Sequence, residues 1–340
     1  MVRIGLVGLG FMGYIHFLAS KALAGARVAA VCSRDPKKLT GDWRSIRGNF
    51  GPPGSMVDLD GVAKYADYAE LLADPSIDLV DLCNPTNQHP GYAIRAMEAG
   101  KHVLVEKAIA LTLAEADEML AVSKRTGTML MVAHVLPFFP EFAFAAEAVA
   151  KGTYGSLLGG HLKRVIAEPD WSAAIGDADA TGGPAVDLHI HDTHFLGLIA
   201  GVPQRVSSLG RLKGSAVTYL TTSYDYGPGG PVLTCSSGAI AMPSRPFVHG
   251  FELYFERATL AFDSGGLPLT VFPQSGEPEK PDLGDGEPIA AFSREIGAAT
   301  AAVATGTMPP LLSAVLARDA LHLCQLECES VKTGRPMACR

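Results

Sequence analysis

The chain has 340 residues and a formal net charge of −7, with 28 Lys and Arg residues against 35 Asp and Glu residues. This length exceeds one ordinary hydrophobic core, so we expect two domains. Lys and Arg form no cluster, which excludes the basic surface of a nucleic-acid-binding protein. The apolar start of the chain is too short for a membrane span or a signal peptide, so we expect a soluble, cytoplasmic protein that does not bind membranes.

Continuous apolar runs alternate with helical patterns in the first third of the chain. Runs rich in Val and Ile are typical of parallel strands covered on both faces. Their alternation with helices predicts a doubly wound parallel sheet of the α/β class, which we assign to a first domain at residues 1–127. A segment rich in Gly, Pro and Asp, residues 40–61, is expected to be an irregular insertion that could flank a ligand. The five apolar runs occupy residues 2–7, 27–33, 77–84, 102–107 and 128–134.

A different pattern begins beyond residue 150. Phe251, Leu253 and Phe255 alternate with Glu252 and Glu256, which predicts strands of an antiparallel sheet with one buried face. Helices are expected at residues 288–304 and 311–333. The second domain, residues 128–340, is therefore predicted to be α+β with a mainly antiparallel sheet, and its final helix could pack back on the first domain. The expected strands occupy residues 156–168, 205–214, 217–226, 231–240, 250–262 and 268–272.

The motif GLGFMG places Gly8, Gly10 and Gly13 directly after the first apolar run and at the start of the first helical pattern. Glycines at this spacing let the backbone turn tightly and approach a pyrophosphate, whose charge then faces the helix N-terminus. The motif, with Phe11 and Met12 between its glycines, predicts a Rossmann-type dinucleotide site. The alternative is a purely structural glycine turn.

The residues after the second run bear on the choice of dinucleotide. An NAD site usually offers Asp or Glu to the ribose 2′-hydroxyl at this point, whereas this chain has Ser33 and Arg34. With Lys38 nearby, these side chains could bind a 2′-phosphate, so NADP is favoured and NAD is possible. Alternatively, Arg34 stacks on the adenine, and Asp35 lies close enough to weaken the argument.

Polar residues also follow the third and fourth runs, at the edge where ligands of an open parallel sheet bind. Lys107, in the sequence VEKA, is positioned to meet the nicotinamide and the substrate, with a solvated lysine as the alternative. His89 is a further cofactor-lining candidate that could instead cap the next helix. The other cofactor-lining candidates at this edge are Asn84, Pro85, Asn87 and Glu106.

The segment DLHIHDTH concentrates Asp187, His189, His191, Asp192 and His194 in one helical pattern that follows two glycines and a proline. On a continuous helix, Asp187, His191 and His194 lie at i, i+4 and i+7 and share one face. The chain lacks an HExxH or paired-cysteine motif to complete a metal site, so no metal is expected. For His189 and His194, a core or capping role is favoured over catalysis.

These motifs, in this order and spacing, resemble the Gfo/Idh/MocA family of oxidoreductases, which includes glucose-fructose oxidoreductase and inositol dehydrogenase. The resemblance covers nearly the whole chain and implies a Rossmann domain followed by a domain with an open, mainly antiparallel sheet. It implies that Lys107 faces the substrate, that Asp187 binds it and that His191 transfers its proton. It also implies a carbohydrate or polyol substrate and a homodimer or homotetramer.

Two residues depart from the family pattern. The family usually has Glu-Lys-Pro, often with a cis peptide, where this chain has Ala108 after Lys107. A cis peptide before Ala costs about 3 kcal/mol, so we predict a trans peptide and a shifted lysine. Pro137 stands where many members have an arginine. This difference leaves the substrate contacts of that segment undefined.

The expected function is an NAD(P)-dependent interconversion of a secondary alcohol and a ketone on a sugar, a polyol or a sugar derivative. One alternative is a glycosidase in which bound NAD is oxidised and reduced within each turnover, so that no net NADH accumulates. Another alternative is a non-catalytic nucleotide-sensing regulator, because a fold does not determine a function.

Overall fold

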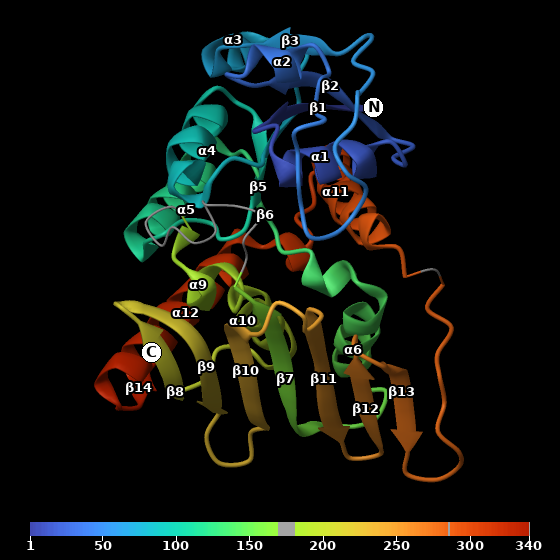
Figure 1. Cartoon of the computed structure of the whole chain (residues 1–340), viewed down its shortest axis with the longest axis vertical. Helices are drawn as coiled ribbons and strands as arrows, with labels where there is room; N and C mark the ends of the chain where they lie inside the picture. The colour runs from blue at the N-terminus through green and yellow to red at the C-terminus, as the bar shows by residue number, and fades with distance from the viewer. Residues whose placement is uncertain (169–180, 285, 340) are drawn as a thin grey trace. The chain divides into compact units, whose positions relative to one another are not determined.

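The computed structural model describes residues 1–168, 181–284 and 286–339. The chain forms two compact units (Figure 1). Unit 1 contains Met1–Phe138 and Glu287–Arg318, and unit 2 contains Phe139–Gly286 and Asp319–Arg340.

Unit 1 is built on a six-stranded parallel sheet with the strand order β3-β2-β1-β4-β5-β6. The order changes direction at β1, which lies between β2 and β4, as in doubly wound dinucleotide-binding sheets. The predicted α/β class is therefore confirmed. The three-residue β3 was not predicted, because so short a segment carries no periodic signal. The strands are β1 (Val2–Val7), β2 (Ala26–Cys32), β3 (Ala63–Tyr65), β4 (Leu79–Leu82), β5 (His102–Glu106) and β6 (Leu130–Ala133).

Except for α11, the helices of unit 1 connect successive strands of this sheet. α5 shows how the sequence sets their ends, because Thr112 and Glu115 form a reciprocal capping box and Gly127 ends the helix in the left-handed conformation. α11, although it comes late in the chain, belongs to this unit and packs on α1. The helices are α1 (Phe11–Ser20), α2 (Pro36–Leu39), α3 (Tyr68–Ala73), α4 (His89–Glu98), α5 (Leu113–Thr126) and α11 (Pro288–Thr305), with 3₁₀ turns η1 (Thr86–Gln88), η2 (Leu136–Phe138) and η3 (Pro310–Leu312).

The insertion at residues 40–61 packs into the core of unit 1 instead of forming a loose loop. Trp43 has no exposed surface, and its indole meets the rings of Phe17 and Tyr14 of α1 edge to face. The hydroxyl of Tyr14 lies 3.1 Å from that of Ser55. Burial of this apolar surface explains how a segment with little secondary structure is held against α1.

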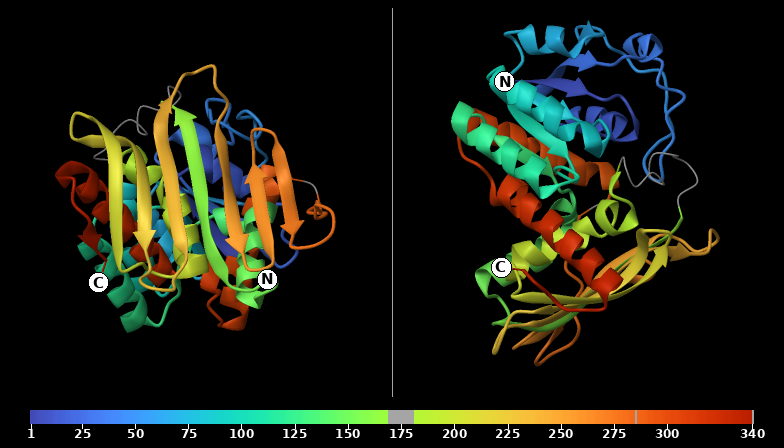
Figure 2. Two further views of the ribbon diagram at one scale, coloured as in Figure 1. Left: turned by 90° about the horizontal axis from the view of Figure 1, so that it is seen from below. Right: turned by 90° about the vertical axis from the view of Figure 1, so that its left-hand side faces the viewer.

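Unit 2 is built on an eight-stranded sheet with the order β13-β12-β11-β7-β10-β9-β8-β14. Only β7 and β10 pair in parallel among these strands, so the predicted mainly antiparallel sheet is confirmed. In the left view of Figure 2, one face of this sheet is turned to the viewer and uncovered. The strands are β7 (Leu157–Ala167), β8 (Arg205–Lys213), β9 (Ala216–Asp225), β10 (Val232–Ala241), β11 (Val248–Phe255), β12 (Ala258–Asp263), β13 (Leu267–Pro273) and β14 (Met337–Ala338).

The other face of the sheet carries the core of unit 2. Leu162, Leu233 and Leu253 point to this face from β7, β10 and β11 and are completely buried. Helices cover them, and α12 continues from unit 1 into unit 2. The helices are α6 (Pro140–Lys151), α9 (Pro184–Asp187), α10 (Ile190–Ala200) and α12 (Ala314–Thr333).

The boundary between the units differs from the expected division at residue 127. β6 pairs with β5 and so extends unit 1 to Phe138. α11 and the first residues of α12 also belong to unit 1, where Arg318 pairs with Asp117 at 2.9 Å. The sequence analysis allowed only the final helix to return to the first domain and missed α11, because such a return depends on tertiary contacts.

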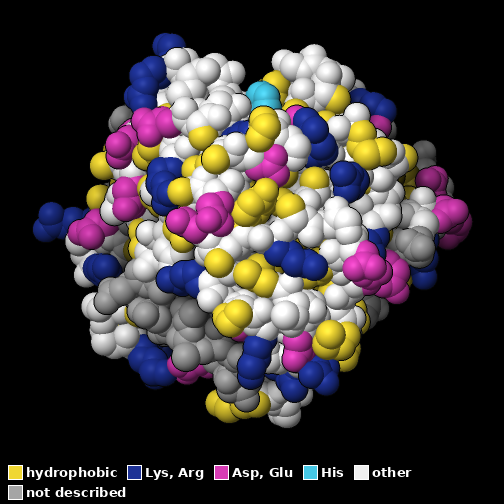
Figure 3. Space-filling model, turned by 90° about the horizontal axis from the view of Figure 1, so that it is seen from above, with side chains coloured by type: hydrophobic (Ala, Val, Ile, Leu, Met, Phe, Trp, Pro, Cys, Tyr) yellow, Lys and Arg dark blue, Asp and Glu magenta, His cyan; other side chains and the backbone are white. Residues whose placement is uncertain are grey.

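Charged side chains of both signs are interspersed on the face of the molecule that Figure 3 shows. Within the described ranges, no helix combines the length and the apolar character needed to cross a bilayer.

An unusual feature of unit 1 is a carboxyl group on the buried face of α11. Glu295 has no exposed surface, and among the described residues neither of its carboxyl oxygens has a hydrogen-bond partner. Burial raises its pKa well above the ordinary value; the neighbouring carboxylates of Glu106 and Asp81 raise it further, whereas His16 lowers it. Glu295 therefore keeps its proton in the folded protein at pH values at which an exposed carboxyl group has already lost it.

This protonation makes stability fall as pH rises. Between the unfolded and the folded pKa of Glu295, the unfolded chain releases a proton that the folded protein keeps, which costs about 1.4 kcal/mol of stability per pH unit. Glu295→Gln removes this titration. We expect the melting temperature of Glu295→Gln, relative to that of the parent protein, to rise as the pH increases above about 4. Glu118→Gln, at an exposed position of α5, is the matched control. A Glu295→Gln effect that is the same at every pH would contradict the assignment.

Candidate functional site

The three glycines of the GLGFMG loop have three different surroundings. Gly8 has a φ of +89°, and a Cβ there would lie 2.7 Å from the backbone of Cys83 and Asn84. A Cβ on Gly13 would lie 2.2 Å from the carbonyl oxygen of Gly8. The first and last glycines are therefore required for a tight turn and for close packing of α1 against it.

Gly10 has another role. A Cβ on Gly10 would meet nothing within 4 Å, so the space beside it is open. Gly10 is the N-cap of α1 and supplies no side-chain cap, and the first turn of the helix has no acidic residue. Backbone N–H groups at such a helix start attract an anion. The loop therefore fits the pyrophosphate of a dinucleotide.

Other side chains hold this loop in place. Lys38 donates from Nζ to the carbonyl oxygen of Leu9 over 2.5 Å. Phe11 is half-buried, its ring stacks edge to face on Phe50, and it fills the space beside Gly48 of the insertion. Met12 is also half-buried. Lys38 is thus tied to the loop itself.

The residues after β2 leave a cation exposed beside the expected ribose position. Arg34 is exposed, whereas Ser33 is half-buried and accepts a hydrogen bond from the backbone N–H of Asp35 at 3.1 Å. The carboxylate of Asp35 accepts from the N–H of Lys37 at 3.0 Å and caps α2. The one carboxylate in this segment is therefore already engaged in a helix cap.

The segment after β4 separates into exposed and buried candidates. Pro85 and Asn87 are exposed, and the side-chain amide of Asn84 is buried with no hydrogen-bond partner among the described residues. His89 has no exposed surface, and its ring nitrogens each lie 2.8 Å from a carbonyl oxygen, one of Asn84 and one of Ala108. His89 therefore links two loops from within, whereas the buried amide of Asn84 is left without a hydrogen-bond partner among the described residues.

Lys107 follows β5 at the same edge of the sheet and is half-buried. Its backbone N–H donates to Oε2 of Glu106 at 3.0 Å, and Oε1 of Glu106 lies 3.1 Å from Nε2 of His16. The other ring nitrogen of His16 lies 2.9 Å from the carboxylate of Asp81. His16, Asp81 and Glu106 are all buried, so the carboxylate of Glu106 points into unit 1. It holds Lys107 in place through the backbone N–H of that residue.

The charge on His16 explains why its contacts with Asp81 and Glu106 are stable. Burial alone would lower the pKa of His16, but the carboxylate of Asp81 raises it, and the net pKa lies well above the ordinary value. A protonated His16 can donate to Asp81 and Glu106 together and so compensates two buried carboxylates.

Ala108 and Pro137, the two residues that depart from the family pattern, are both described by the structure. The Lys107–Ala108 peptide is cis, so the predicted trans peptide was wrong. That prediction considered only the intrinsic preference of the peptide bond and not tertiary contacts such as the bond between the Ala108 carbonyl and His89. Pro137 is buried within η2, where the adjacent carbonyl of Phe138 accepts a hydrogen bond from Nε of Arg294 at 3.0 Å.

A cavity of about 610 Å³ opens at the opposite edge of the unit 1 sheet, where the strands begin. Its polar groups are engaged within the protein, since Lys101 donates to two backbone carbonyls and Asp78 pairs with Arg3. Ligands of parallel sheets bind beyond the carboxyl ends of the strands, so we assign no catalytic role to this cavity.

In unit 2, burial separates the five polar residues of DLHIHDTH. Asp187 and His191 are partly exposed, whereas His189, Asp192 and His194 are at most 1% exposed. The structure thus places Asp187 and His191 where a ligand can reach them. Burial lowers the pKa of His194 to about 3, so this ring is neutral.

The helix that carries these residues is interrupted. α9 ends at Asp187 and α10 begins at Ile190, and the N–H of His189 reaches back five residues to the carbonyl of Pro184 at 3.3 Å. The expected face with His194 at i+7 was therefore wrong, because this wide turn changes the register and buries His194.

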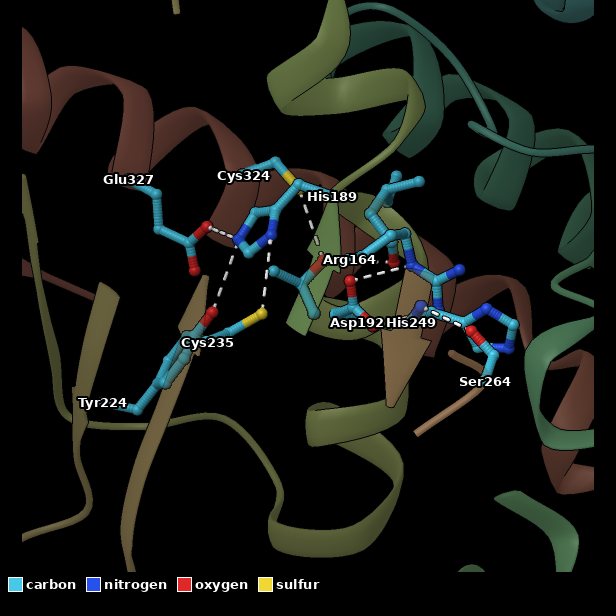
Figure 4. A network of polar contacts seen from close by, with 11 residues as sticks. Arg164, His189, Asp192, Tyr224, Cys235, His249, Ser264, Cys324 and Glu327 are labelled. Atoms are coloured by element: carbon cyan, nitrogen blue, oxygen red, sulfur yellow. Dashed lines mark hydrogen bonds and ion pairs between the residues drawn. The ribbon is translucent and has the colours of Figure 1, made fainter. Parts of the chain in front are cut away.

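The buried residues of this segment have partners that the sequence analysis missed. Asp192 pairs with Arg164 of β7, and His189 pairs with Glu327 of α12 (Figure 4). A signal for Glu327 was available, because it lies on the apolar face of α12 with Ala320 and Cys324. An acidic residue on a buried helix face indicates a hidden partner. Glu295 also lies on a buried face of its helix, α11, but its carboxyl oxygens have no hydrogen-bond partner among the described residues.

Comparisons with known proteins agree with this geometry. Residues 2–134 match the Gfo/Idh/MocA family model, described as an oxidoreductase family with an NAD-binding Rossmann fold. An uncharacterized oxidoreductase of Rhizobium meliloti, ORF334, is 30% identical over 266 residues, which are 77% of this chain and 74% of that protein. The myo-inositol 2-dehydrogenase of Thermotoga maritima is 30% identical over 201 residues, 59% of this chain and 55% of that protein.

A solved structure shows the same fold over both units. Levoglucosan dehydrogenase in complex with NADH and levoglucosan has a TM-score of 0.85 and 20% identity, and the match covers 99% of this chain and 98% of that chain. The fold, the glycine loop and the relatives agree, and this chain belongs to the Gfo/Idh/MocA family of NAD-binding oxidoreductases.

Proposed function

We propose that this protein is an NAD(P)-dependent dehydrogenase that interconverts a secondary alcohol and a ketone on a sugar, a polyol or a sugar derivative. The observation that carries the proposal is the position of Lys107 at the end of β5, on the same sheet edge as the glycine loop. A cation there can polarise the oxygen at the carbon that exchanges a hydride. The named relatives, which include a myo-inositol dehydrogenase, support a polyol-like substrate.

The residues of unit 1 fit a bound dinucleotide. Gly8, Gly10 and Gly13 would hold its pyrophosphate at the start of α1, and the unpartnered amide of Asn84 would bind near the nicotinamide end. The exposed Arg34 and the engagement of Asp35 in a helix cap support a preference for NADP over NAD. When bound, the nicotinamide supplies the hydride acceptor or donor.

Three side chains would act on the substrate. His191, partly exposed at the start of α10, accepts the hydroxyl proton during oxidation, because an imidazole ring nitrogen can act as a general base. In unit 1, the ammonium group of Lys107 would stabilise negative charge that develops on a substrate oxygen. Asp187 accepts a hydrogen bond from a substrate hydroxyl and orients it. Ketone reduction uses these roles in reverse.

His191→Ala should lower the turnover of the true substrate by about 10²–10⁴-fold, because general-base catalysis is lost. The dissociation constant of NADPH should stay unchanged, because the glycine loop lies in unit 1. Turnover is measured as NAD(P)H absorbance on a panel that includes myo-inositol and levoglucosan, and cofactor binding by fluorescence titration.

His102→Ala provides the control, because this half-buried histidine lies at the opposite edge of the unit 1 sheet, where its Nδ1 accepts a hydrogen bond from the N–H of Met129 at 3.0 Å. Unchanged turnover in His191→Ala would rule out the proposed base. Cleavage of a glycoside with no net NADH would favour the glycosidase, and no turnover of any polyol would favour the regulator.

Arg34→Ala tests the cofactor preference. If Arg34 binds the 2′-phosphate, its removal should weaken NADPH binding by about tenfold or more and leave NADH binding nearly unchanged, since a charge-assisted hydrogen bond is lost. Arg27→Ala, at an exposed position of β2, is the matched control. Parallel losses for both cofactors would show that Arg34 stacks on the adenine instead.

We further propose that the uncovered sheet face binds a second copy of this chain. Gly159 lies between Val232 and Tyr254 in register, and the missing side chain leaves a hollow of about 360 Å³ beside these exposed apolar residues. Val232 is 75% exposed, and Leu158 is 51% exposed beside it. An exposed apolar patch of this kind is typical of an interaction surface.

Val232→Glu should shift the protein to a smaller oligomer, because a charge would be buried in the interface. Light scattering coupled to size-exclusion chromatography measures the mass. Val315→Glu is the control, since this valine is 58% exposed on another element, α12. A parent protein that is already monomeric would refute the proposal.

A further inference from the structure

In the segment around His191, one partly exposed side chain lies between buried side chains that have partners elsewhere in unit 2. His191 is partly exposed, whereas His189, two residues before it, and Asp192, directly after it, are both 0% exposed. Both buried residues are charged or chargeable. The interior of unit 2 therefore determines where the backbone of His191 lies.

His189 is held from three elements of unit 2 (Figure 4). Its Nε2 lies 2.5 Å from Oε2 of Glu327 on α12 and 3.4 Å from the hydroxyl of Tyr224 on β9. Its Nδ1 lies 3.8 Å from Sγ of Cys235 on β10. Burial alone lowers the pKa of His189, but Glu327 and Asp192 raise it and Arg164 lowers it, and the net pKa is raised. His189 thus forms a buried ion pair with Glu327.

Asp192 is held just as firmly on the other side of His191. Nε and Nη2 of Arg164 donate to its two carboxylate oxygens at 2.9 and 3.0 Å. Arg164 is 5% exposed and comes from β7. Two parallel hydrogen bonds of this kind fix orientation as well as distance.

The same atoms could suggest a metal site, because ligand atoms of His189, Asp192 and Cys235 lie within 4.8 Å of one another. However, both oxygens of Asp192 are engaged by Arg164, and Nε2 of His189 is engaged by Glu327. A guanidinium ion bound to the carboxylate repels a cation. The two ion pairs already compensate the buried charges, which favours anchoring over metal binding.

Anchoring on both sides matters because the helix is irregular here. The wide turn at Leu188 and His189 has non-standard hydrogen bonds, so local backbone preference alone does not define its geometry. The two ion pairs fix this turn to β7 and α12. Rotation of the segment would break a buried pair and leave an uncompensated charge.

We propose that His189 and Asp192, through Glu327 and Arg164, are positioning residues that hold His191 in its catalytic orientation. This inference rests on the proposed role of His191 as the base. Neither His189 nor Asp192 contacts the substrate.

The test compares variants that remove or keep the contact of His189. His189→Leu should lower turnover by about tenfold or more, since misplacement of a catalytic group by about 1 Å can cost more than this. NADPH binding should be unchanged. His189→Gln keeps an amide donor near the position of Nε2 and should recover part of the loss. Glu327→Gln keeps the shape without the charge and should give an intermediate loss, so it carries the test if His189→Leu does not fold.

Ser330→Ala is the matched control on the same helix. Ser330 is 1% exposed, accepts a hydrogen bond from the N–H of Ser208 at 2.9 Å and donates to the carbonyl of Arg335 at 2.7 Å. Its replacement should lower the melting temperature without changing turnover. The inference would be overturned if Ser330→Ala and His189→Leu had equal melting temperatures and lost turnover equally. The ion pair of His189 with Glu327 would then have only a structural role.

NMR of histidine-labelled protein separates the inference from the proposed function. The ring resonances of His191 should shift in His189→Leu and Glu327→Gln but not in Ser330→Ala. If they shift while His191→Ala retains turnover, positioning stands and the proposed base is wrong. If His191→Ala loses turnover while His189→Leu changes neither resonances nor turnover, the inference alone is wrong.

Discussion

Charge inside a protein must be compensated. The buried ion pairs that meet this requirement hold in place both segments that carry the proposed catalytic residues. In unit 1, the His16 imidazole lies between the carboxylates of Asp81 and Glu106, and Glu106 in turn binds the backbone of Lys107. In unit 2, two ion pairs flank His191. In both units, a half-buried side chain that we propose to act in catalysis is attached to backbone that buried charges hold in place.

The first domain could be predicted well from the sequence, because each long parallel strand is a continuous apolar run and the glycine motif follows the first of them. The last helix was predicted at residues 311–333 and lies at Ala314–Thr333. Local signals of this kind depend on residues that are near one another in the chain. β3 is too short to give such a signal, and the cis peptide after Lys107 was mispredicted from local preference alone.

The site could be predicted only in part for the same reason. Asp187 and His191 were selected by the family resemblance of a local motif, and the structure leaves both partly exposed. Their supporting residues lie far away in sequence: Glu327 is 138 positions from His189, and Arg164 is 28 positions from Asp192. Spacing within a segment does not identify partners at such separations. The interruption at His189 also changed the helical face that regular spacing had predicted.

The packed insertion at residues 40–61 has a consequence for the entropy of cofactor binding. A mobile glycine loop would lose conformational freedom when it closes around a pyrophosphate, and that loss would weaken affinity. Here Phe11 is held beside Gly48 and Phe50, while Lys38 holds the carbonyl of Leu9 from the other side. The loop is therefore ordered before the dinucleotide arrives. Shortening the insertion would weaken binding through lost preorganisation, although none of its residues need touch the cofactor.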